Sequence, residues 1–212
     1  MPQILINALR ETLYMVLYSG LFSIALGIPF GILIANIANS PRYWLKSIYF
    51  ALNSVVQAFN FIPYLLVMLI FIPTTNWLIS RHISYTTATI LPLGITGAML
   101  LAHHVNIIFQ ELIKKWHNTT KSLGASQKQT LIYILLPESF SSMMLAATST
   151  CASLVGFTVA AGALGAGGLG QLAIEKSIQD QNFTYVLICI ATLVAIQQLI
   201  KYTGILAVQH KE

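Results

Sequence analysis

Residues 124–137 read GASQKQTLIYILLP, and they lie in a charged segment, 111–138, that separates two long apolar runs. Ser126 with Gln129 three residues later has the pattern of a capping box, which predicts that a helix begins here and runs through 130–135. Pro137 is expected to stop or kink this helix, because proline has no backbone N–H to donate. The stretch therefore predicts a short helix that leads directly into the next apolar run.

The residues before this stretch predict a second short helix. Asn118 suits the N-cap of a helix over 119–123, and Gly124 suits the left-handed conformation that ends it. Together the two helices would form a hairpin with a tight turn. A polar hairpin that merely connects two longer helices would have the same pattern, so these signals predict local structure and leave its function open.

The composition is that of a membrane protein. Of the 212 residues, 56% are hydrophobic and 8% are charged, and the mean hydropathy is +0.74. Soluble domains have about a quarter of their residues charged, so an ordinary soluble enzyme or binding module is excluded. The net charge of +5 is diluted among apolar residues and forms no patch for a nucleic-acid backbone, so it indicates membrane topology.

Charged residues divide the chain into apolar intervals, each long enough for one membrane crossing of about 20 residues and none comfortably long enough for two. We therefore expect an all-α polytopic membrane protein. Its first apolar run is longer than that of a cleaved signal peptide and has a weak positive flank, so it is expected to be a crossing. The five expected transmembrane helices span approximately 12–37, 48–72, 87–110, 139–164 and 183–207.

Basic residues predict the orientation, because they are enriched on the cytoplasmic side of membrane proteins. With the N-terminus outside, Arg10, Arg81 and Lys176 are the basic residues outside. The reverse orientation would invert this bias. We therefore expect the N-terminus outside, the C-terminus in the cytoplasm and the segment 111–138 in the cytoplasm. The basic residues then inside are Arg42, Lys46, Lys114, Lys115, Lys121, Lys128, Lys201 and Lys211.

Four positions of the charged segment carry a resemblance to a known family. Gly124, Ile134, Leu136 and Pro137 have the spacing of the cytoplasmic loop in permease subunits of bacterial ATP-binding-cassette importers. In that family a short helix before the glycine docks into a groove on the ATPase. The resemblance implies a single type I importer permease domain over 1–212, with 111–138 as its coupling loop. The residues implied to contact the ATPase are Asn118, Thr119, Thr120, Lys121, Ser122, Leu123, Gly124, Ala125 and Ser126.

The resemblance has one local exception and extends beyond the loop. The family usually has Glu-Ala-Ala six residues before the glycine, where this chain has Asn-Thr-Thr at 118–120, so the acidic group is missing. The stretches 60–76, 135–139 and 154–171 resemble methionine-importer permeases. The run GALGAGGLG at 162–170 is shared with permeases for glycine betaine and related osmoprotectants. Methionine is therefore the expected substrate, with an osmoprotectant or another amino acid as the alternative.

The resemblance also implies partners and a location. Relatives are dimeric, so we expect a second copy of the chain, two cytoplasmic ATPase subunits and an extracytoplasmic binding protein or lipoprotein, in the bacterial cytoplasmic (inner) membrane. The chain has no Walker sequence, and no acidic residue is expected deep in the bilayer. No cofactor or metal is therefore expected on this chain, ATP and Mg being used by the ATPase. The same features argue against a membrane-embedded enzyme and an ion-coupled secondary transporter.

Glycines and a proline mark candidate positions along the pathway. Gly165, Gly167 and Gly170 form G-x-G-x-x-G, but no strand is expected before them, so a dinucleotide site is rejected. Glycines there allow close helix approach and bending, and ordinary small-residue packing remains the alternative. His103 and His104 point about 100° apart on a helix and cannot form one ligand pair. The pathway or gate candidates are Pro63, Gly156, Gly162, Gly165, Gly167, Gly168 and Gly170.

Overall fold

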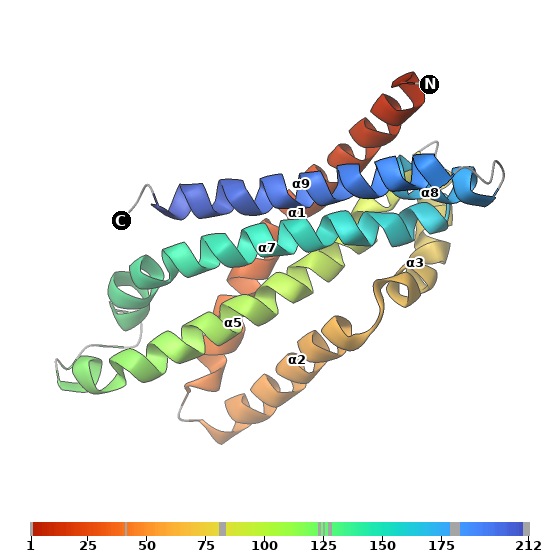
Figure 1. Ribbon diagram of the computed structural model, residues 1–212. Helices are drawn as coiled ribbons and strands as arrows, with labels where there is room; N and C mark the ends of the chain where they lie inside the picture. Colours follow the sequence, from red (N-terminus) through yellow and green to blue (C-terminus); the bar gives the residue numbers. More distant parts are fainter. Residues whose placement is uncertain are drawn as a thin grey trace.

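The computed structural model describes residues 2–40, 42–80, 84–122, 124, 126, 129–178 and 183–209, and every regular element in these ranges is helical (Figure 1). The predicted all-α class is confirmed. The elements are α1 (Pro2–Ala38), α2 (Tyr43–Phe61), α3 (Tyr64–Ile79), α4 (Tyr85–Ala88), α5 (Ile90–Ser122), the π-helix η1 (Thr130–Leu135), α7 (Leu136–Ala163), α8 (Gly168–Ile178) and α9 (Phe183–Gln209).

α5, α7 and α9 run side by side with α7 in the middle, and α1 crosses them (Figure 1). α2 packs along the other side of α5. The two chain ends lie at opposite ends of the bundle, and α5 ends at the same end of the bundle as the C-terminus (Figure 1). The turn after α5 is therefore separated from the N-terminus by the length of the helices.

α1 and α5 are in close contact because small residues lie between them. The Ser23 hydroxyl on α1 donates a hydrogen bond to the backbone carbonyl of Gly94 on α5, at 3.0 Å. A Cβ on Gly27 would lie 2.8 Å from the Ala98 carbonyl oxygen, so a larger residue there would push the helices apart. Small residues allow such close backbone approach in membrane helices, where packing rather than water exclusion drives association.

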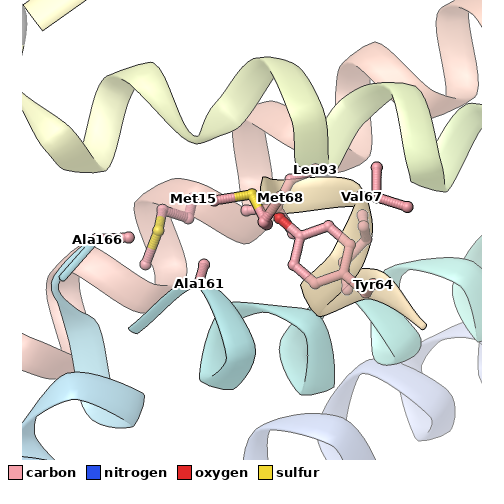
Figure 2. Packing of buried hydrophobic residues seen from close by; sticks show 8 residues of the cluster. Met15, Tyr64, Val67, Met68, Leu93, Ala161 and Ala166 are labelled. Carbon is pink, nitrogen blue, oxygen red and sulfur yellow. The ribbon is translucent and has the colours of Figure 1, made fainter. Parts of the chain in front are cut away.

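Separate clusters of buried apolar residues hold the two ends of the bundle. At the end near the N-terminus, Met15 of α1 and Leu93 of α5 meet Ala161 of α7 and the start of α3, in a cluster that Figure 2 shows from close by. At the other end, Phe109 of α5 packs in a cluster with Leu135 of η1. A third cluster, which includes Ala8, Leu169, Leu172 and Cys189, joins α1, α8 and α9.

Most of the expected crossings coincide with helices long and apolar enough to cross a membrane. Among the described residues these are Gln3–Ala38, Tyr85–Trp116, Thr130–Ala163 and Phe183–Gln209. The expected single helix over 48–72 is wrong. α2 and α3 are bent by 104° at a break, and only as a pair do they pass the same test of length and composition. Pro63 causes the break, because it has no N–H and holds Ile62 before it in an extended conformation with ψ 124°.

Candidate functional site

The expected coupling loop, 111–138, has two helical arms joined by a turn. Its first arm is a continuation of α5. This helix runs to Ser122, so the separate helix over 119–123 with Asn118 as its N-cap is wrong, since Asn118 lies within α5. No glycine or proline occurs between Gly97 and Gly124 to interrupt the helix. The Thr120 hydroxyl donates to the Trp116 carbonyl one turn earlier, at 3.0 Å, as expected inside a helix.

The turn between the arms has the conformation that the sequence predicts. Gly124 has φ +64°, the left-handed conformation predicted for it. The capping box is also confirmed: the Ser126 backbone N–H donates to Gln129 Oε1 at 2.9 Å, and the Gln129 N–H donates to Ser126 Oγ at 3.3 Å. Leu123, Ala125 and Lys128 lie outside the described residues, as do the side chains of Asn118 and Lys121.

The second arm is the π-helix η1, which continues into α7. The Leu136 N–H donates to the carbonyl of Leu131, five residues earlier, which is the π-helical pattern. The expected stop or kink at Pro137 is replaced by this change from π to α. Pro137 lies in the first turn of α7, where a missing N–H costs little.

Side chains join the two arms. Lys115 on α5 forms an ion pair with Glu138 on α7, with 2.8 Å between Nζ and Oε1. Three motif positions, Ile134, Leu136 and Pro137, are called the framework residues of the loop. Beside this ion pair, Trp116 of α5 lines a cavity together with the framework residues Ile134 and Pro137. The third framework residue, Leu136, packs against the cluster around Phe109 and Leu135. Glu138 therefore supplies an acidic group between the arms, a role that was not predicted from the sequence.

The glycine-rich stretch forms a tight turn between α7 and α8. Gly165, Gly167 and Gly168 have φ of +86°, +91° and +77°. A Cβ on Gly170 would lie 2.6 Å from Val159 Cα, and one on Gly162 would collide with the Gln171 backbone nitrogen, so α8 packs closely against the end of α7. Gly156, in contrast, would place a Cβ at an ordinary 3.7 Å from Gln197 Nε2. Close packing or a tight turn therefore explains the glycine at each of these candidate positions except Gly156. The role of these glycines in a pathway stays a prediction.

Two residues of α1 cap the N-terminus of α8. The Gly168 N–H donates to Glu11 Oε2 at 2.7 Å, and the Leu169 N–H donates to Thr12 Oγ1 at 2.9 Å. A carboxylate at a helix N-terminus also interacts favourably with the helix dipole. Neither α8 nor this contact was predicted, because the partners are 157 residues apart in the chain.

Hydrogen-bonded polar side chains join α2 to α5, within the part of α5 that is apolar enough to cross a membrane. We call this set the polar seam; it consists of Tyr49 and Asn53 on α2 with Asn106 and Gln110 on α5. Asn106 Nδ2 donates to Asn53 Oδ1 at 3.3 Å, and Gln110 Nε2 donates to both Tyr49 Oη at 2.8 Å and Asn106 Oδ1 at 3.0 Å. This seam was not predicted from the sequence. The four-residue spacing of polar residues on each helix was the signal that could have found it.

A cavity lies at the break between α2 and α3. Pro63, the remaining pathway candidate, is one of its lining residues. The Tyr64 ring stacks on Phe157 of α7, with 4.8 Å between the ring centroids. The histidines of α5, His103 and His104, have ring centroids 6.1 Å apart, and no group of three or more metal-ligating residues occurs in the described part of the chain. The full lining of the cavity is Phe59, Asn60, Phe61, Ile62, Pro63, Tyr64, Thr96, Leu100 and Phe157.

Long apolar helices, a broken helix pair and a braced loop between α5 and α7 define the class of an α-helical polytopic membrane protein. Residues 27–201 match the family of binding-protein-dependent transport system inner membrane components. The chain belongs to this family, which confirms the expected importer-permease resemblance and the inner-membrane location.

Curated relatives match nearly the whole chain. A probable D-methionine transport system permease protein, MetI, of Vibrio cholerae is 30% identical over 95% of this chain and 89% of that protein. A methionine import system permease protein, MetP, of Bacillus subtilis is 31% identical over 93% of this chain and 89% of that protein.

Solved structures share the fold. A chain from inward facing conformations of the MetNI methionine ABC transporter has a TM-score of 0.86 at 29% identity, covering 99% of this chain and 97% of that chain. A chain of an amino acid ABC transporter crystallised with histidines has a TM-score of 0.76 at 19% identity, covering 99% of this chain and 94% of that one, and shows a common fold alone.

Proposed function

We propose that this protein is the permease subunit of an ATP-driven importer and forms the pathway for methionine across the cytoplasmic membrane. The observation that carries the proposal is the similarity to methionine permeases, which covers almost the whole chain in sequence and in fold. The loop supports it as well, because Gly124 has the left-handed conformation and Ser126 with Gln129 forms the capping box that the motif predicts.

The proposed topology has five crossings, with α2 and α3 together forming one broken crossing. The N-terminus lies outside and the C-terminus in the cytoplasm. This agrees with the position of the two chain ends at opposite ends of the bundle, and with the shared end of the C-terminus and the loop (Figure 1). The surplus of basic residues on the loop side supports the same orientation.

The proposed mechanism couples ATP use to transport through the loop. Two copies of the chain enclose the pathway, two ATPase subunits bind the loops through residues 118–126, and an external binding protein delivers the solute. Because α5 continues without a break to Ser122 and packs through Phe109 against Leu135 of η1 and Met143 of α7, a movement of the ATPase at the loop would be passed to both helices. Closure of the ATPases on ATP would open the bundle outward, and hydrolysis would restore the inward-facing state.

Uptake of labelled methionine at submicromolar concentration tests the proposal, in cells with and without the gene and with unlabelled glycine betaine as competitor. We expect uptake to be lost without the gene and not to be reduced by glycine betaine. Unchanged uptake in cells without the gene would contradict methionine as the substrate.

A further inference from the structure

The cavity at the α2–α3 break contains an unpaired polar group that the coupling mechanism does not use. Asn60 lines the cavity, and its buried Nδ2 has no hydrogen-bond partner among the described residues. Tyr64 also lines it with its ring, while the hydroxyl of this 6% exposed residue points toward Met68 in the buried cluster (Figure 2). Buried polar groups in native proteins are nearly always hydrogen-bonded, so the unpaired Asn60 Nδ2 at a cavity indicates that a ligand completes it.

The break also brings backbone carbonyl oxygens, which carry partial negative charge, close to backbone N–H groups, which carry partial positive charge. α2 ends at Phe61, and Pro63 has no N–H to donate to the Phe59 carbonyl, so this carbonyl at the negative end of α2 has no helical donor and suits a cation. α3 begins at Tyr64, and the first N–H groups of a helix have no acceptor within it, which suits an anion. A broken membrane helix therefore offers sites for an ammonium group and for a carboxylate close together.

The remaining walls are apolar and aromatic. Tyr64 and Phe157 are stacked with an interplanar angle of 18°, and Leu100 of α5 lies on the same cavity. Stacked rings of this kind suit an apolar or thioether side chain, since sulfur makes favourable contacts with aromatic rings.

We propose that the cavity at the α2–α3 break is a solute site within the permease itself, which takes a zwitterionic amino acid with an apolar side chain. The carboxylate accepts hydrogen bonds from Asn60 Nδ2 and the first turn of α3. The ammonium group donates to the open carbonyls of α2, and the side chain packs on Tyr64 and Phe157. The identity of the amino acid rests on the proposed function of methionine transport.

Photolabelling tests this site directly. The complex of the permease with its ATPase is reconstituted in lipid nanodiscs without the binding protein, and a methionine analogue that carries a diazirine is photolysed on it. We expect the label on peptides that contain residues 59–64 or Phe157, and we expect excess methionine to prevent the labelling. Label elsewhere, or label that methionine does not compete with, would overturn the site, and this result is read on the wild-type chain without any variant.

A matched pair of variants sharpens the test. Asn60→Asp keeps the size of the side chain but replaces the amide donor with a charge that repels a carboxylate, so we expect labelling to fall about tenfold or more. Asn39→Ala is the control, because Asn39 directly follows α1, where its amide donates to the Ala35 carbonyl, and it does not line the cavity. Each variant is first checked for co-purification with the ATPase, and equal labelling of the two would overturn the role of Asn60.

Uptake separates failure of this site from failure of the proposed function. If wild-type cells import methionine through this protein but the label lies outside the cavity, the site assignment is wrong and the proposed function stands. If they import none, the proposed function fails, and the assignment of a methionine site fails with it.

Discussion

Two turns of the chain use glycine at positive φ in different surroundings. Gly124 after α5 has φ +64°, and a Cβ there would meet no described atom within 4 Å. Gly168 after α7 has φ +77°, and its Cβ would lie 2.6 Å from Thr12 Oγ1 on α1. The turn at Gly124 therefore needs glycine for the backbone alone and leaves room for a partner. The turn at Gly168 needs glycine both for the backbone conformation and for the space beside α1. We call this turn the internal joint, because it packs against α1 inside the protein.

The largest expected effect follows from filling the internal joint. Gly168→Val should lower the free energy of unfolding through left-handed strain of about 1–2 kcal/mol and overpacking of about 1–3 kcal/mol. Gly165→Val is the matched control, because Gly165 has φ +86° but open space around it in the described structure. Thermal unfolding of the purified proteins in detergent measures both. An equal loss of unfolding free energy in the two variants would contradict the claim that Gly168 is needed for space as well as for its backbone conformation.

Replacing Gly124 should leave the fold intact and affect coupling. Gly124→Val disfavours the left-handed turn by about 1–2 kcal/mol, which corresponds to roughly tenfold fewer correctly formed loops. Gly124→Asn is the control, since asparagine tolerates this conformation. With ATPase and binding protein in proteoliposomes, we expect methionine uptake per ATP hydrolysed to fall in the valine variant and to persist in the asparagine variant. Wild-type coupling in the valine variant would argue against a rigid loop.

Removing the cap of α8 should have a smaller effect. Glu11→Ala leaves the Gly168 N–H without its carboxylate, and loss of a helix cap costs about 0.5–2 kcal/mol. Glu11→Gln keeps an acceptor oxygen and should lose less stability. The midpoint of thermal unfolding measures both, and an alanine variant as stable as the wild type would show that Thr12 alone holds α8.

The brace between the loop arms should contribute least. The side chains of Lys115 and Glu138 are 62% and 37% exposed, so their coupling energy should be below about 1 kcal/mol and should decrease with added salt. A double-mutant cycle with Lys115→Met and Glu138→Gln measures it. A much larger coupling energy would mean that the pair is shielded from water in the assembled protein.

Features with local causes were predictable from the sequence. The conformation of Gly124 and the capping box of Ser126 with Gln129 depend on a few adjacent residues, and both are confirmed. The role of Asn118 was mispredicted, because asparagine fits either an N-cap or a helix interior, and no breaker stood before it to end α5. Hydropathy predicted the apolar crossings for the same local reason.

Features with distant causes were not predictable. The cap of α8 joins Glu11 to Gly168 across 157 residues of sequence, and no local signal links them. Pro63 predicts a bend, but the angle of 104° depends on how α3 packs, including the stacking of Tyr64 on Phe157. The polar seam needs the register between α2 and α5, which only the folded chain provides.

Chemical labelling of the loop tests the central claim, that it lies in the cytoplasm and binds the ATPase. A cysteine replaces the exposed Thr119 in a chain whose Cys151 and Cys189 are changed to alanine. A membrane-impermeant maleimide is then applied to intact and to permeabilised cells, with and without the ATPase. We expect labelling only after permeabilisation, and strong protection when the ATPase is present. Labelling in intact cells, or labelling that the ATPase does not change, would contradict the account.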